Sequence, residues 1–259
     1  MTFSEAQLNL WLSSFIWPFF RIAAMVTAAP IFSTRQVPVS FRVGLVLVLT
    51  WVTVPLLPAP PVVDAFSHDA LMLLLQQLAI GLSMGFVLQM VFGGLIFGGQ
   101  AVAYSMGLGF ASMMDPQNGV QVPVVSQFYL ILATLLFLVL NGHLILIELL
   151  YQSFFTFPIS TVGLGRSAFS DVIAWGSQLF SGGLLMALPV MAALLLVNLG
   201  MGIVTRAAPQ LNIFAVGFPV TMLIGFVLIW GSLPDVMDNF RQLLESGFAL
   251  IQALLKISG

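Results

Sequence analysis

Residues that could carry catalytic or metal chemistry are few in this chain. It holds two histidines and no cysteine, which excludes disulfides, thiolate metal ligands and cysteine nucleophiles. His143 and Glu148 share one apolar stretch, but a separation of five positions puts them about 140° apart around a helix. Side chains on different faces do not form a metal pair or a proton relay. We therefore expect no catalytic residue, no cofactor and no metal, and the sequence disfavours an enzyme.

A segment of another kind, Met106–Pro123, lies between two long apolar stretches. Its glycines and its Asp-Pro and Asn-Gly steps disfavour a continuous helix, yet it carries one charge. Backbone of this kind occurs at membrane depth only where it lines a cavity or is buried in protein. We interpret it as the functional segment, with an ordinary interhelical turn as the alternative. Its candidate residues are Met106, Gly107, Gly109, Phe110, Met113, Met114, Asp115, Pro116, Asn118 and Gly119.

Phe110, Met113 and Met114 give this segment flexible and apolar side chains beside its glycines. Methionine adapts its shape to varied surfaces. These three side chains could form a deformable seal that opens for a bulky substrate and closes against ions.

Small and amide residues recur at every fourth position of the stretch Ala70–Tyr104, and a shorter stripe follows later in the chain. This spacing lets two helix backbones approach closely and lets amides bond across the contact. Packing within the chain and a seam between subunits are both compatible with the pattern. The predicted packing residues are Gln77, Gly81, Gly85, Gln89, Gly93, Gly94 and Gly98, followed by Asn198, Gly202 and Arg206.

Arg21 lies inside the first apolar stretch, one turn after Trp17. A guanidinium group buried among apolar residues is costly and is usually paired or functional. A side chain that extends along the helix to reach water is the alternative.

The elements that position these residues are predicted to be membrane helices. Of 259 residues, 60 % are apolar and 6 % are charged, whereas a soluble domain carries charge on about 25 % of its residues. We predict an all-α polytopic membrane protein. The net charge of −2 and the scattered basic residues give no basis for nucleic-acid binding. The apolar stretches are Leu8–Phe32, Val43–Leu57, Ala70–Tyr104, Val124–Leu150, Val172–Val204 and Leu211–Leu233.

Two stretches leave their structure open. Ala70–Tyr104 is compatible with one long tilted helix or with a helix pair bent at Gly93-Gly94. Asn239–Ser258 alternates apolar and charged residues at helical spacing, which predicts an amphipathic helix at an interface or against a partner.

The segment Gly107–Tyr129, followed by Leu140–Leu144, closely resembles the FliR family of flagellar type III export-gate proteins. The likeness rests on the Asp115-Pro116 step, the run Pro123-Val-Val-Ser-Gln-Phe128 and Asn141-Gly-His143, which occur together and in this order. It extends over essentially the whole chain. Injectisome relatives share the Asp-Pro region, but the later motifs are more similar to the flagellar branch.

The resemblance implies a subunit that assembles with FliP and FliQ, and with FlhB and FlhA nearby, in the bacterial inner membrane at the flagellar basal body. Unfolded flagellar proteins pass through the channel of that assembly, and Met106–Val122 corresponds to the family's plug loop. The resemblance also implies a FliP-like part over about 1–170 joined to a FliQ-like helical hairpin over about 171–259. It places Asn198, Arg206 and Gln210 in a subunit seam.

Three rival hypotheses remain compatible with the sequence. One is a virulence-type export-gate subunit. Another is a self-contained secondary transporter with Arg21, His143 and Glu148 in a midplane site. The third is an assembly scaffold that has no role in the pore.

Overall fold

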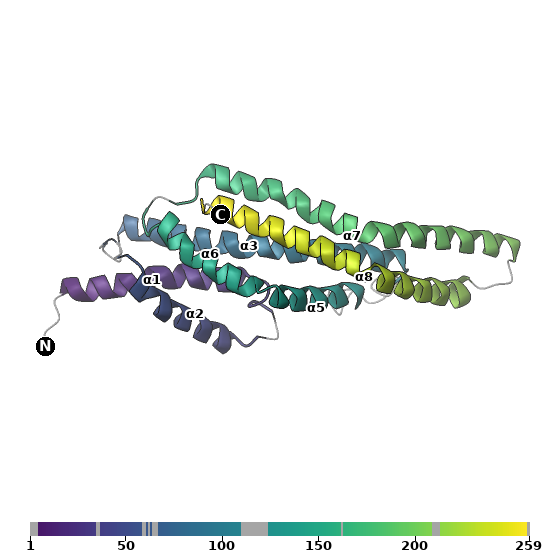
Figure 1. The fold of residues 1–259 in the computed structure, drawn as a ribbon, viewed down its shortest axis with the longest axis horizontal. Helices are drawn as coiled ribbons and strands as arrows, with labels where there is room; N and C mark the ends of the chain where they lie inside the picture. The colour runs from purple at the N-terminus through teal and green to yellow at the C-terminus, as the bar shows by residue number, and fades with distance from the viewer. Residues whose placement is uncertain are drawn as a thin grey trace. The chain divides into compact units, whose positions relative to one another are not determined.

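The structure of this chain is a computed structural model that describes residues 5–34, 37–58, 61, 63, 67–109, 124–161, 163–208 and 213–257. Seven α-helices and one short 3-10 helix make up the fold of these residues, and none of them forms a strand (Figure 1). The predicted all-α class is confirmed. The helices are α1 (Glu5–Ala28), α2 (Val39–Thr53) with η1 (Val54–Leu56), α3 (His68–Ser105), α5 (Val124–Val139), α6 (Gly142–Thr156), α7 (Arg166–Ala207) and α8 (Ile213–Leu254).

Helix α3 is one continuous helix that runs through Gly93-Gly94 without a break. Of the two alternatives, the single long helix is correct and the helix pair bent at Gly93-Gly94 is wrong. Each helical glycine costs about 1 kcal/mol relative to alanine. Here the cost is offset by close packing, because a Cβ at Gly98 would lie 2.6 Å from the backbone oxygen of Gly183 in α7.

The apolar stretch Val124–Leu150 forms two helices rather than one. Helix α5 ends at Val139 and α6 begins at Gly142, with Asn141 between them in the left-handed conformation at φ 55°. The carbonyl of Asn141 accepts hydrogen bonds from the backbone of Leu144 and Ile145 and so starts the new helix. Asparagine tolerates this backbone conformation better than most residues do.

Helix α8 joins two segments that the sequence separates. Helix α8 continues through Pro234, so it contains most of Leu211–Leu233 and most of the predicted amphipathic helix Asn239–Ser258. The prediction that this helix turns its apolar face to an interface or a partner is wrong, because the chain buries that face itself. The buried side chains are Phe240, Leu243, Leu244, Phe248, Ile251, Leu254 and Leu255.

The chain divides into two compact units, each assembled from separate stretches of sequence. Unit 1 comprises Met1–Met90, Leu140–Trp175 and Glu245–Gly259, and unit 2 comprises Val91–Val139 and Gly176–Leu244. In unit 1, Trp17 packs with Ala70 and Leu73. In unit 2, the ring of Phe92 makes edge contacts with Phe137 and Phe240. The predicted division into a FliP-like part and a FliQ-like part concerns resemblance along the sequence and not compact units. It stays a prediction.

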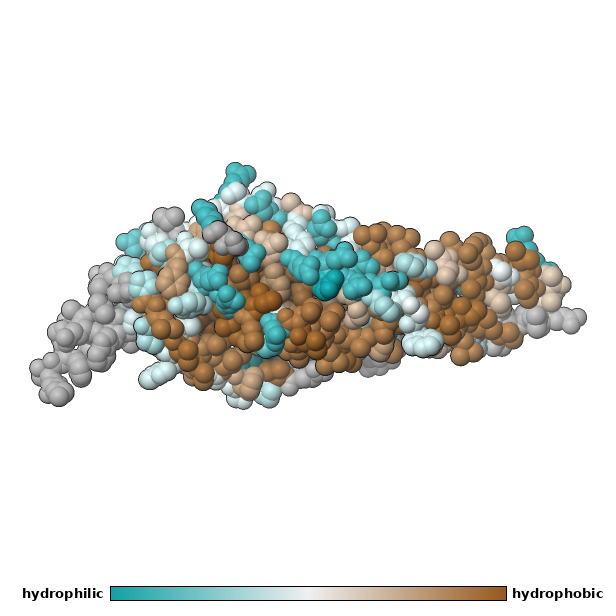
Figure 2. Space-filling view, in the orientation of Figure 1, coloured by the Kyte–Doolittle hydropathy of each residue, from teal (hydrophilic) through white to brown (hydrophobic). Residues whose placement is uncertain are grey.

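Within the described residues, four helical segments are long and apolar enough to cross a membrane: Val39–Leu56, His68–Ser105, Arg166–Ala207 and Val216–Leu254. Helices α5 and α6 count as a fifth span if the pair is taken together. The surface supports this conclusion, since Figure 2 shows wide apolar areas in brown. In unit 2, for example, Leu196 of α7 is 70 % exposed and Trp230 of α8 is 79 % exposed. The prediction of a polytopic helical membrane protein is confirmed.

Candidate functional site

The candidate segment begins at a closed helix end. At the end of α3, the backbone NH of Leu108 donates to the carbonyl of Ala103, and that of Gly107 donates to the carbonyl of Tyr104. These two bonds form a Schellman motif, which needs a residue in the left-handed conformation just after the helix end. Gly107 has φ +83° and supplies it. Helix α3 therefore ends because of Gly107, and the segment that follows starts from a fixed point.

Met106 is fully buried and belongs to this helix end. A Cβ at Gly225 of α8 would lie 2.7 Å from Met106 Cε, so the missing side chain of the glycine makes room for the methionine. One residue further on, Gly107 packs near the ring of Phe218. Of the predicted plug residues, Met106 and Gly107 thus hold the end of α3 against α8.

The remaining candidates of the segment divide into two groups. Gly109 lies beside Tyr104, since a Cβ there would be 2.6 Å from that ring. The others lie outside the described residues: Phe110, Met113, Met114, Asp115, Pro116, Asn118 and Gly119.

The segment ends at Val124, where α5 begins, and this side is also anchored. Ser126 Oγ donates a hydrogen bond of 3.1 Å to the carbonyl of Ile96 in α3. A Cβ at Gly99 would lie 2.7 Å from Ser126 Cα, so α3 and α5 are in close contact here. Both ends of the segment are therefore held by the same helix.

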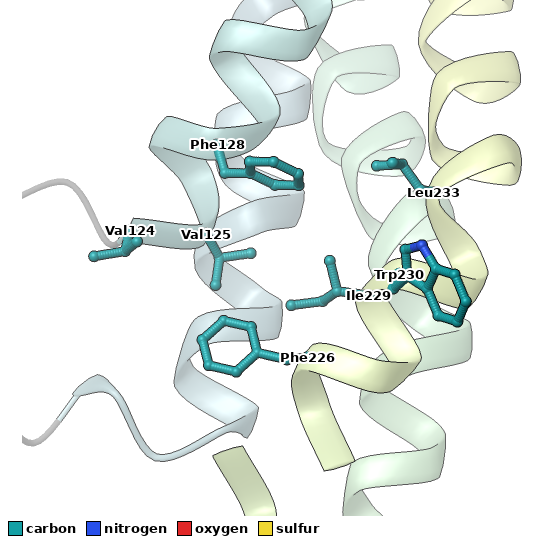
Figure 3. Close-up of a pocket in the computed structure, with 7 residues that line it drawn as sticks. All are labelled: Val124, Val125, Phe128, Phe226, Ile229, Trp230 and Leu233. Atoms are coloured by element: carbon teal, nitrogen blue, oxygen red, sulfur yellow. The ribbon is translucent and has the colours of Figure 1, made fainter. Parts of the chain in front are cut away.

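A pocket of about 260 Å3 opens at the start of α5, facing α8 (Figure 3). Every side chain that lines it is apolar, and Figure 3 shows Phe128 and Phe226 pointing toward it from the two helices. Among its described lining residues, the indole of Trp230 is the one side chain that can form a hydrogen bond. The lining residues are Val124, Val125 and Phe128 of α5, and Phe226, Ile229, Trp230 and Leu233 of α8.

The predicted glycine ridge of α3 contacts two different helices of the same chain. In unit 1, a Cβ at Gly81 would meet Ala24 Cβ at 2.8 Å, and one at Gly85 would meet the backbone of Ala29 at 2.8 Å. In unit 2, Gly93 and Gly94 contact Leu179 of α7.

The intrachain alternative is therefore what the structure contains for Gly81, Gly85, Gly93, Gly94 and Gly98. Gln89 is exposed and lies outside these contacts. A further role of the ridge residues between subunits stays a prediction.

The second stripe lies on an exposed face of α7. Asn198 Nδ2 donates a bond of 3.2 Å to the carbonyl of Ser105, the last residue of α3. Gly202 and Arg206 are exposed, and no atom of the described residues lies within 4 Å of a Cβ at Gly202. Gln210 lies outside the described residues.

Arg21 is fully buried in unit 1, so it does not extend to water. Its Nε donates to Gln77 Oε1 at 2.8 Å, and its two terminal nitrogens donate to the carbonyls of Ser153 and Phe157, each at 2.8 Å, and to Ser153 Oγ at 3.1 Å. The guanidinium also lies 4.2 Å from the ring centre of Phe154.

All of these partners of Arg21 are neutral, and two of them are carbonyls at the last turn of α6. A helix C-terminus carries a partial negative charge of about half a unit. Arg21 therefore caps α6, and the helix end serves as its counter-charge. The sequence did not predict this role, because every residue type supplies a backbone carbonyl.

His143 and Glu148 both lie on α6 and are not joined to Arg21. The carboxylate of Glu148 accepts a bond of 3.1 Å from Gln152 Nε2, one turn further along. His143 Nδ1 is buried, with no hydrogen-bond partner among the described residues.

Comparison with known proteins identifies the family. Residues 12–247 match the model of bacterial export proteins, family 1. Flagellar biosynthetic protein FliR of Escherichia coli K12 is 39 % identical over 252 residues, which covers 97 % of this chain and 96 % of that protein.

The chain belongs to the FliR family. The FliR proteins of Pectobacterium carotovorum and Bacillus subtilis are 38 % and 31 % identical to it, and each alignment covers at least 95 % of both chains. The resemblance drawn from the Asp-Pro and Asn-Gly-His motifs is confirmed, and so is its flagellar branch. As a FliR-family member, the chain is a subunit of the flagellar export gate and a membrane component of that apparatus.

Proposed function

We propose that this FliR-family chain helps to form the channel of the flagellar export gate, and that Met106–Val122 plugs this channel against ions until an unfolded flagellar protein passes. The observation that supports this proposal is that both ends of the segment are fixed. Met106 is seated against Gly225 at one end, and Ser126 is bonded to α3 at the other. A plug must stay attached while its sealing part gives way, and two firm ends provide that attachment.

The proposed partners are FliP and FliQ, with FlhB and FlhA, in the bacterial inner membrane. The exposed side of α7 supports an assembly of this kind. It combines large apolar side chains such as Leu199 and Ile203 with the polar stripe of Asn198, Gly202 and Arg206. A helix of another subunit could approach closely at Gly202, because no side chain in the described part of the chain lies within 4 Å of a Cβ there.

The secondary-transporter hypothesis finds no support in the geometry of its site. Arg21 is enclosed by α3 and α6 and bonded to neutral groups, whereas Glu148 is on an exposed position bonded to Gln152. The three residues proposed for that site do not meet.

The test replaces residues 110–122 with a glycine-serine sequence of equal length, which leaves the Gly107 cap and the start of α5 intact. Cells are assayed for ion leakage and for secretion of a flagellar substrate. We expect leakage to rise, because the replacement lacks the aromatic, methionine and Asp-Pro residues that would seal the channel.

The matched control replaces residues 58–66, the connection between η1 and α3, in the same way. It should leave ion permeability unchanged. Unchanged permeability and normal secretion after replacement of 110–122 would reject the plug assignment. Leakage from both replacements would show a general loss of assembly and would reject it as well.

A further inference from the structure

Helix α1 is poorly suited to cross a membrane alone. Its 24 residues, Glu5–Ala28, are enough to span a bilayer, so length alone does not exclude a span. The obstacle is a charge inside its apolar stretch. Arg21 stands in the middle of it. A central arginine biases an isolated helix against the membrane by roughly a hundredfold.

The groups that satisfy Arg21 come from parts of the chain made much later. Gln77 follows it by 56 residues, Ser153 by 132 and Phe157 by 136. Until these residues exist, the guanidinium has none of the acceptors that it uses in the folded protein.

The slot that receives α1 is shaped for close contact. Gly81 and Gly85 of α3 bring its backbone against Ala24 and Ala28 of α1, so the two helices touch without intervening side chains. The side chains of Ile22, Met25 and Val26 are each fully buried. The face of α1 that carries these side chains is therefore closed to lipid.

We propose that α1 is not an independent membrane span but docks into a slot built by α3 and α6, which is complete only after Phe157 has been synthesised. Arg21 is the positioning residue of this step. Its charge keeps α1 out of lipid, and the acceptors of α3 and α6 admit it to the slot.

The absence of cysteine from the chain allows a direct test with two single-thiol variants. Val26→Cys places a thiol at a fully buried position of α1, here called the α1 thiol. Val102→Cys places one at a fully buried position of α3 in unit 2, called the α3 thiol. Full-length chains in their own export apparatus are treated with a water-soluble maleimide in permeabilised membranes, and total thiol is counted after denaturation.

The slot is then perturbed with Gln77→Met, which keeps the volume but removes the acceptor of Arg21 Nε. We expect the α1 thiol to be protected in the otherwise unaltered chain and to be labelled about fivefold more with Gln77→Met, because a charged α1 without its slot moves to water. The α3 thiol should stay protected. Adding Arg21→Met to Gln77→Met should restore protection of the α1 thiol, because an uncharged α1 can remain in lipid. This rescue separates a charge effect from simple packing.

Two outcomes overturn the proposal. One is protection of the α1 thiol in the Gln77→Met chain, which would show that α1 holds its place without the slot. The other is labelling of the α1 thiol that Arg21→Met fails to suppress, which would show that packing alone seats α1. If Gln77→Met exposes both thiols or lowers the amount of protein, the Arg21→Met addition is still the test. Renewed protection of the α1 thiol supports the proposal, and continued labelling contradicts it. Gln77→Glu, which keeps an acceptor for Arg21, should leave the α1 thiol protected.

Discussion

Alanine at Gly81 tests the close contact of α1 and α3 quantitatively. A Cβ at this position would overlap the carbonyl oxygen of Arg21, and it would lie 2.8 Å from Ala24 Cβ and 3.0 Å from the Met25 nitrogen. Two of these neighbours are backbone atoms and the third is a Cβ, so no change of rotamer relieves the overlap. Overpacking of this kind costs about 1–3 kcal/mol.

The same substitution also improves helix propensity, by about 1 kcal/mol. Gly200→Ala in α7 isolates that gain, because none of the residues that the structure describes has an atom within 4 Å of a Cβ there. The free energy of unfolding of the two variants should therefore differ by the steric cost alone, about 1–3 kcal/mol, with Gly81→Ala the less stable.

Equilibrium unfolding of the extracted protein in mixed detergent, followed by tryptophan fluorescence, measures both variants on the same scale. We expect the midpoint of Gly81→Ala to lie below that of Gly200→Ala, which should rise or stay constant. Equal midpoints would refute the reasoning, because they would mean that α1 does not fill the ridge of α3.

Three further predictions concern single positions. Gly107→Ala should reduce secretion of flagellar substrates, because a left-handed backbone costs alanine about 1–2 kcal/mol. Gly107→Asn should lose less, and equal secretion by both variants would contradict the cap. Asn141→Val should lower the thermal midpoint for the same reason, whereas Asn141→Gly should not, and a normal midpoint for the valine variant would argue against the left-handed break. Gly202→Ala should leave the stability of the isolated chain intact but weaken co-purification of partner subunits, and unimpaired co-purification would remove Gly202 from the seam.

The sequence was sufficient for the class of fold because composition and apolar length are local properties. It also located the ridge of α3, since the spacing of Gln77, Gly81 and Gly85 is visible in one stretch. It could not show that α1 fills part of this ridge and α7 another, because the small residues of a ridge do not specify their partner. Pro234 gave a misleading signal, since proline ends most helices but α8 continues through it.

The surroundings of Arg21 show a different limit of sequence reasoning. The transporter hypothesis placed Arg21 in one midplane site with His143 and Glu148, both of which lie on α6. The structure instead uses carbonyls of Ser153 and Phe157, which any residue type supplies. A backbone acceptor becomes recognisable only once the helix end is placed in three dimensions.

The cap at Gly107 has a mechanical consequence. The carbonyls of Ala103 and Tyr104 are bonded within the cap, and that of Ser105 accepts a hydrogen bond from Asn198, so these three carbonyls do not rely on the segment that follows. A pull on the chain after Gly109 acts on a closed helix terminus that is also wedged by Met106 beside Gly225. Tension from a passing polypeptide would be spread into α8 instead of unwinding α3 turn by turn. We therefore expect the end of α3 to stay in place when the proposed plug is displaced.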